Sequence, residues 1–206
     1  MYVLDQQAIR SVDANGIVPF VECWERYYDY ANYDDRVYFA ELNLDGEVTP
    51  QNIIRLLRWK DPRMLTHPKK ADGEPNPRVV RVLEQIGSIN GFRNGGLTAD
   101  EFHAVTQNVF PNGMIWQLFL FHIARPSEWP IADQHVFRSY SLLFKAPAPD
   151  SVTAYRSYAK AFRQLAETFR QSAAIQDSTS LDVVKTNKRV DNALFAFGQF
   201  LAKYAR

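Results

Sequence analysis

The sequence lacks several features that would point to common protein classes. It has one cysteine, Cys23, which excludes a disulfide within the chain, an iron–sulfur cluster and a zinc site built from several cysteines. Its longest apolar run, residues 114–124, contains Gln117 and His122 and is too short to cross a membrane. The first residues turn acidic at Asp5 and do not resemble a signal peptide. We therefore expect a soluble, cytoplasmic protein with no metal, no other cofactor and no membrane partner.

The sequence also lacks an excess of either sign of charge, because the formal net charge is only +1. The charge is nevertheless uneven along the chain. Residues 1–50 hold three lysines and arginines against ten acidic residues, and residues 51–206 hold 21 against 13. A basic body can bind a polyanion such as DNA on one face, although two oppositely charged solvated faces would give the same balance.

Aromatic residues are abundant, with 14 Phe, 10 Tyr and 4 Trp in 206 residues. Most of them are expected to fill the core, because aromatic side chains bury large apolar areas. Some could instead line a pocket or stack on bases. Trp116 and Trp129 remain open to both interpretations, because they flank the segment that we consider below.

Periodicity predicts a mainly α-helical fold. Thr49-Pro50 and the capping box Thr98-Ala-Asp-Glu101 each begin a helix. Residues 114–124 are apolar nearly all round, which predicts a buried central helix. Apolar residues at three- and four-residue spacing predict two further helices after residue 150. The first of these helices has an apolar face made of Tyr155, Tyr158, Phe162, Leu165 and Phe169. The second has an apolar face made of Val190, Leu194, Phe197, Leu201 and Tyr204.

Three other segments have weaker patterns. Residues 37–44 fit either a short β element or a helix end, and residues 61–77 are rich in Pro, Lys, Asp and Gly, which predicts an exposed loop. A helix is expected from about Pro77 to Ile86, followed by a flexible connection at 90–96. We expect an N-terminal helical region over 1–95 and a second helical region over 96–206, forming one compact unit.

The most informative part of the sequence lies between Val109 and Arg138. It runs through a Pro/Gly hairpin at 109–115, the buried helix, and a loop at 129–138 that reads Trp-Pro-Ile-Ala-Asp-Gln-His-Val-Phe-Arg. This order resembles the helix–hairpin–helix superfamily of base-excision DNA glycosylases. In that family an Asp-x-His-Val loop follows the hairpin by about twenty residues, and Asp133 follows Gly113 at this distance. The later Leu194-x-x-x-Gly198 also resembles a signature of the family.

The resemblance implies the helix–hairpin–helix glycosylase fold and a role for each matched residue. The hairpin residues Asn112, Gly113 and Met114 would bind a phosphate of double-stranded DNA through backbone N–H groups. Asp133 would be the catalytic carboxylate in hydrolysis of the N-glycosidic bond of a damaged base. His135 and Arg138 would contact DNA, and Trp116 and Trp129 would border the pocket for the flipped base. Alternatively, Asp133 is simply a helix N-cap.

Two departures from the family pattern limit the chemistry. The nucleophilic lysine of the family falls at Ile115, which cannot form a Schiff base, so lyase activity is not expected. The cluster-binding cysteines of the family are absent as well. Two functions remain open. One is monofunctional hydrolysis by a divergent DNA glycosylase. The other is a non-catalytic helical module of the same fold that binds DNA or a protein partner.

Overall fold

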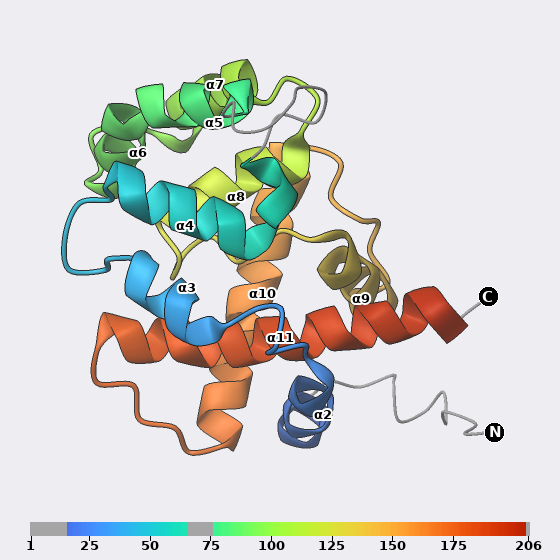
Figure 1. Cartoon of the computed structure of the whole chain (residues 1–206). Helices are drawn as coiled ribbons and strands as arrows, with labels where there is room; N and C mark the ends of the chain where they lie inside the picture. The colour runs from blue at the N-terminus through green and yellow to red at the C-terminus, as the bar shows by residue number, and fades with distance from the viewer. Residues whose placement is uncertain (1–15, 66–75, 205–206) are drawn as a thin grey trace. The chain divides into compact units, whose positions relative to one another are not determined.

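The computed structural model describes residues 16–65 and 76–204, which form ten α-helices, two 3-10 helices and no strand (Figure 1). The mainly α prediction is therefore confirmed for these residues. No described helix is both long and apolar enough to cross a membrane. The elements are α2 (Ile17–Trp24), η1 (Glu25–Tyr27), α3 (Asp35–Glu41), α4 (Pro50–Lys60), η2 (Pro62–Met64), α5 (Pro77–Glu84), α6 (Ile86–Arg93), α7 (Ala99–Val109), α8 (Met114–Ala124), α9 (Gln134–Phe144), α10 (Val152–Ser172) and α11 (Ser180–Tyr204).

The chain divides into two compact units. The first unit combines the two ends of the chain, Met1–Asp29 and Pro130–Arg206, and its described helices are α2, η1, α9, α10 and α11. The second unit is the continuous segment Tyr30–Trp129 and holds α3 to α8. The expected boundary at residue 95 lies within this second unit, between α6 and α7, which pack against each other.

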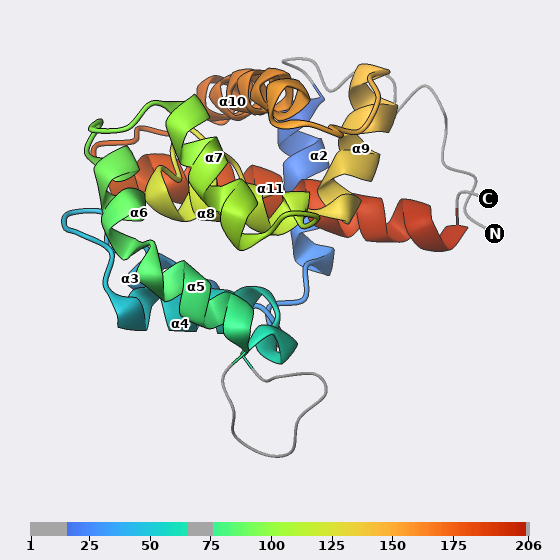
Figure 2. The same cartoon turned by 90° about the horizontal axis from the view of Figure 1, so that it is seen from above.

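In the first unit, α11 is the central helix and contacts α9, α2 and α10 (Figure 2). The apolar face predicted for α10 is buried, with Tyr155 and Phe169 fully covered. Gly198 of α11 lies directly against the backbone of α9. A Cβ atom at Gly198 would lie 1.9 Å from the carbonyl oxygen of His135, so only glycine fits at this crossing.

In the second unit, α8 is buried from Gln117 to Ala124 and packs against α6 and α7. The rings of Phe92, Phe102 and Phe121 meet between these three helices, with centroids 4.5 to 5.2 Å apart. The prediction of a buried central helix over residues 114–124 is therefore confirmed, since each residue from Gln117 to Ala124 is buried.

The structure corrects two local predictions. Residues 35–41 form α3, so the β alternative for 37–44 is wrong and the helical alternative is confirmed. Asp34 caps this helix by accepting a hydrogen bond from the N–H of Arg36. The connection expected at 90–96 is also wrong in part, because α6 extends to Arg93. In the region expected as a loop, Pro62–Met64 forms η2, and residues 66–75 lie outside the described residues.

Candidate functional site

The hairpin joins α7 to α8 through a tight turn at residues 110–113. The N–H of Gly113 donates to the carbonyl of Phe110 over 3.1 Å, and the side chain of Gln117 donates to the same carbonyl over 2.6 Å. A side chain at Gly113 would be crowded, because its Cβ would lie 3.2 Å from Cβ of Phe110. The turn is thus held by a backbone hydrogen bond from Gly113 and by a hydrogen bond from the buried side-chain amide of Gln117 in α8.

The N-terminus of α8 has no side-chain cap, since Gly113 occupies the N-cap position. The carbonyl of Gly113 accepts from Trp116 and Gln117, which begins the helical pattern. In the described part of the chain, no hydrogen bond uses the N–H groups of Met114 or Ile115. The first N–H groups of a helix carry partial positive charge and bind anions readily. Three of the predicted contacts, Asn112, Gly113 and Met114, therefore lie together at this end of α8.

The surroundings of the turn add one cation and one aromatic ring. Arg81 of α5 donates to the carbonyl of Val109 over 3.4 Å and is itself exposed, so its guanidinium lies beside the turn. The half-buried ring of Trp116 stacks on Phe110, with centroids 6.1 Å apart. Ile115 is half-buried and apolar, so it supplies neither a charge nor a nucleophile at the turn.

Asp133 is the N-cap of α9 in the first unit. Its Oδ1 accepts a 2.8 Å hydrogen bond from the N–H of His135, which satisfies one of the free amides of the helix. The capping alternative that we drew from the sequence is therefore confirmed. The carboxylate is half-buried, and no donor among the described residues of the first unit bonds to Oδ2. Capping thus orients Asp133 and uses one of its two oxygens.

His135 and Arg138 take part in the packing of α9 against α11. Nη1 of Arg138 donates to the carbonyl of Gly198 over 3.1 Å and to Nδ1 of His135 over 3.0 Å. Because an arginine can only donate, Nδ1 of His135 is the acceptor of this hydrogen bond. The ring of His135 also meets Phe195 edge to face at 5.2 Å. A DNA contact by either side chain stays a prediction.

Trp129 belongs to the core of the second unit. Its ring packs on Phe121, with centroids 4.6 Å apart, and only 8% of its surface is exposed. Its carbonyl bonds to Nδ1 of His122 over 2.7 Å, and Nε2 of the same histidine bonds to the hydroxyl of Tyr38 over 2.8 Å. The sequence left open whether Trp129 fills the core or borders a pocket, and the structure places it in the core.

The hairpin and Asp133 belong to different compact units, the second and the first. Each is therefore described, and later tested, as a separate candidate. Among the described residues, no group of three or more His, Cys, Asp and Glu side chains is arranged to hold a metal ion.

Sequence reasoning did not find a buried polar cluster in the first unit, formed by Tyr28, Lys188, Asp191 and Asn192. Lys188 is 3% exposed, and its Nζ lies 3.2 Å from Oδ2 of Asp191 and 3.1 Å from the hydroxyl of Tyr28. It also donates to Asn192. One signal was available in the sequence: Lys188 lies four residues after Val184, within the apolar face of its helix.

Two tyrosines of α10 lie close enough to this cluster to respond to it. Burial raises the pKa of Tyr155 and of Tyr158 well above the ordinary value, and the negative charge of Asp191 raises both pKa values further. Both phenols are therefore neutral in the folded protein at physiological pH. Neither phenol loses its proton readily, as a catalytic acid or nucleophile would have to. The cluster therefore has the properties of a structural core.

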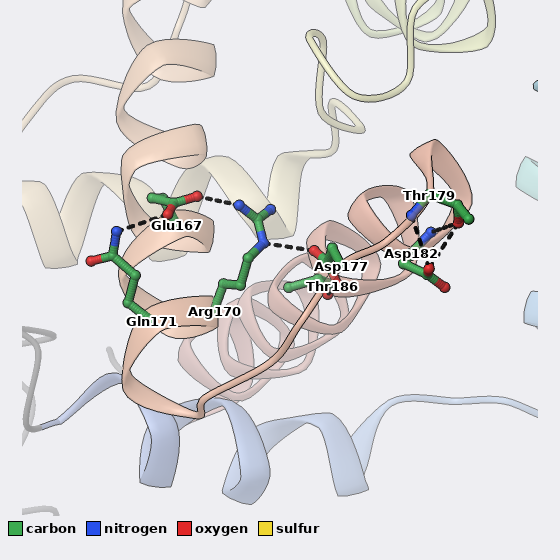
Figure 3. Close-up of polar contacts among 7 residues, drawn as sticks. All are labelled: Glu167, Arg170, Gln171, Asp177, Thr179, Asp182 and Thr186. Atoms are coloured by element: carbon green, nitrogen blue, oxygen red, sulfur yellow. Dashed lines mark hydrogen bonds and ion pairs between the residues drawn. The ribbon is translucent and has the colours of Figure 1, made fainter.

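A second polar group fixes the turn between α10 and α11 (Figure 3). Arg170 bonds to Glu167 and, through Nε, to Asp177 over 2.6 Å. Asp177 also accepts from the hydroxyl of Thr186 over 3.0 Å, so α11 is tied to the end of α10. Thr179 and Asp182 cap the start of α11, and their hydrogen bonds lower the pKa of Asp182. These acids are satisfied within the turn, which assigns them a structural role.

Comparison with known protein families, with curated proteins and with solved structures finds no match to this chain. Any functional proposal therefore depends on the chemistry of its own residues, namely the hairpin of the second unit and Asp133 of the first.

Proposed function

We propose that this protein binds double-stranded DNA, and that the turn at residues 110–113 and the first N–H groups of α8 contact a backbone phosphate. The observation that carries the proposal is the uncapped N-terminus of α8, where the amides of Met114 and Ile115 have no bond within the described chain. A phosphate oxygen is the acceptor that such a pair of amides suits best.

The local chemistry of the hairpin supports this choice of ligand. Asn112 is exposed at the turn, and Gly113 beside it is half-buried and carries no side chain. Arg81 supplies a positive charge beside the turn. The resemblance to helix–hairpin–helix glycosylases, in which this segment binds a phosphate, supports the same ligand.

The binding proposal is tested by placing a negative charge at the turn. Asn112→Glu adds a carboxylate where the phosphate would lie, so we expect duplex binding at low salt to weaken by about tenfold or more. Gln51→Glu is the matched control. It adds the same charge to the exposed first turn of α4, whose N-terminus is closed by the capping box of Thr49 and Asn52. Affinity is measured by anisotropy of a labelled duplex over a range of salt concentrations.

Two results would contradict the binding proposal. One is equal weakening by both variants, which would indicate a general effect of charge rather than a contact at the hairpin. The other is the absence of duplex binding by the wild-type protein at low salt, where phosphate contacts are strongest.

A second candidate function, hydrolysis of the N-glycosidic bond of a damaged base, is favoured by the state of Asp133. Its capping bond holds the carboxylate in place through Oδ1, while Oδ2 has no described donor in the first unit. A carboxylate in this position could activate a water that adds to the sugar as the base leaves. With isoleucine at position 115, the product would be an intact abasic strand rather than a cleaved one.

Asp133→Asn separates catalysis from folding. Asparagine is as good an N-cap as aspartate, so the variant should keep its stability while losing the negative charge. We expect wild-type protein to release a base from at least one duplex of a panel carrying different damaged bases, and the variant to lose this activity by at least about a hundredfold. Base release that survives the substitution would remove Asp133 from the mechanism and leave the non-catalytic DNA-binding module.

A further inference from the structure

The surface of the first unit carries a continuous row of four aromatic rings, which we call the aromatic ladder: Tyr27, Trp24, Phe200 and Tyr204. Successive ring centroids are 5.8, 5.2 and 4.9 Å apart. The row begins in η1, crosses α2 and ends at the last turn of α11, and these elements pack together (Figure 1).

The two ends of the aromatic ladder are strongly exposed. Tyr27 is 70% exposed and Tyr204 is 60% exposed, the highest values among the exposed large hydrophobic residues of the described chain. The middle of the row is anchored from below, because Trp24 packs on the buried ring of Phe197 at 4.9 Å. Contiguous exposed aromatic surface of this kind usually marks an interaction site. The ladder therefore has two exposed rings at its ends and a middle that packs on the core of the first unit.

One positive charge lies against the aromatic ladder. Nζ of Lys203 lies 5.0 Å from the ring centroid of Tyr204. Glu25 is neutralised by Arg189, through bonds of 2.9 and 3.0 Å. Glu22 and Arg26 are both exposed, and each lies two positions from Trp24, a spacing at which residues do not share a helix face. The ladder thus combines aromatic rings with a cation, which suits a polyanion that carries flat rings.

We propose that the aromatic ladder binds single-stranded DNA by stacking its bases on Tyr27, Trp24, Phe200 and Tyr204, with Lys203 contacting a phosphate. Aromatic rings accept any base because each base has a π face. In a duplex these faces are covered by neighbouring base pairs, so the ladder selects unpaired bases. This site lies on the first unit and goes beyond duplex binding by the hairpin of the second unit.

The test uses the full chain and a labelled oligothymidylate of about 12 nucleotides. Tyr27→Ser/Tyr204→Ser removes the two exposed rings, and we expect roughly ten- to hundredfold weaker binding at low salt. Leu142→Ser/Phe144→Ser is the matched control. It removes two apolar side chains of the same unit that are 46% and 39% exposed and lie outside the ladder, so affinity should stay at the wild-type value.

Tryptophan fluorescence gives a second readout. Trp24 is the only tryptophan of the first unit, and a base stacked on it should quench its emission. The quenching should disappear in Trp24→Phe, which keeps Trp59, Trp116 and Trp129. If quenching persists in this variant, another tryptophan reports the binding and the ladder assignment is wrong.

Each remaining outcome also decides between the proposals. Unchanged affinity of the ladder variant, or no binding of the oligonucleotide by wild type, would overturn the ladder site. A loss of self-association in the ladder variant without loss of oligonucleotide binding would identify an interface between copies instead. The hairpin proposal is judged separately, because Asn112→Glu should weaken duplex binding and leave oligothymidylate binding unchanged.

Discussion

At the scale of single residues, Tyr155 and Tyr158 share the core of the first unit but differ in their hydroxyls. Tyr155 donates to the carbonyl of Pro130, whereas no described residue bonds to the hydroxyl of Tyr158. Both side chains are at most 1% exposed. A buried hydroxyl without a hydrogen-bond partner destabilises the folded state. Removing a buried hydroxyl that has a partner leaves that partner without its hydrogen bond. The two tyrosines should therefore respond oppositely to the same substitution.

We expect Tyr155→Phe to lower the free energy of unfolding by about 1–3 kcal/mol, because the carbonyl of Pro130 loses its donor. Tyr158→Phe should change it by less than ~0.5 kcal/mol or increase it. Urea unfolding followed by circular dichroism measures both, and each variant is the control for the other. Equal destabilisation by the two substitutions would contradict the assignment.

The same tyrosines predict how stability depends on alkaline pH. Burial and Asp191 raise their folded-state pKa values above the unfolded value of about 10. A group with a raised folded pKa contributes stability that is present below the unfolded pKa and is lost as pH rises toward the folded pKa. We therefore expect the free energy of unfolding to fall above pH ~10. In an ultraviolet titration, the phenolates of Tyr155 and Tyr158 should appear only as the protein unfolds. In the double variant Tyr155→Phe/Tyr158→Phe, two fewer phenols should ionise on unfolding. This result would confirm the assignment.

At the scale of elements, the crossing of α9 and α11 depends on one glycine. The backbone of His135 lies so close to Gly198 that a methyl group would collide with atoms that cannot rotate away. Gly198→Ala should therefore lower the free energy of unfolding by at least ~2 kcal/mol. Gly87→Ala in α6 is the matched control. Its Cβ would meet no atom within 4 Å, so alanine should stabilise the helix by ~0.5–1 kcal/mol.

Thermal unfolding of the two alanine variants is the measurement. The melting temperature should fall for Gly198→Ala and rise slightly for Gly87→Ala. If both variants melt at the wild-type temperature, then α9 and α11 do not approach as closely as the structure indicates.

Helix starts were predicted well where the capping chemistry is local. The hydrogen bonds of Thr49, Thr98 and Asp133 close the starts of α4, α7 and α9, as their sequence patterns indicate. Prediction was poorer for α6, whose sequence Ile-Gly-Ser-Ile-Asn-Gly-Phe-Arg has low helix propensity. Burial of Ile89 and Phe92 and the bonds between Asn90 and Val48 hold it as a helix. Tertiary packing therefore decided the structure of this segment.

At the scale of the whole molecule, the first unit is built from both ends of the chain. Ile17 and Val21 of α2 are fully buried, and Tyr28 holds the buried ammonium of Lys188. Removing residues 1–29 takes away all of these contacts and leaves Lys188 without one partner. We expect the melting temperature, followed by circular dichroism, to fall by roughly 10 °C or more.

Glu25→Gln is the control for this deletion. It breaks only the pair with Arg189, whose side chains are 21% and 40% exposed, so it should cost less than ~1 kcal/mol. A deletion variant that melts as wild type would show that α2 and η1 do not support the first unit.

The sequence by itself determined the helical class, the buried central helix and the capped helix starts. These properties depend on spacing along the chain and on the identity of single residues. Only the tertiary structure decided which ends join in the first unit, which lysine is buried and where aromatic rings meet on the surface. Such features depend on contacts between segments far apart in sequence, as between Tyr28 and Lys188 or Trp24 and Phe200, and no local pattern encodes them.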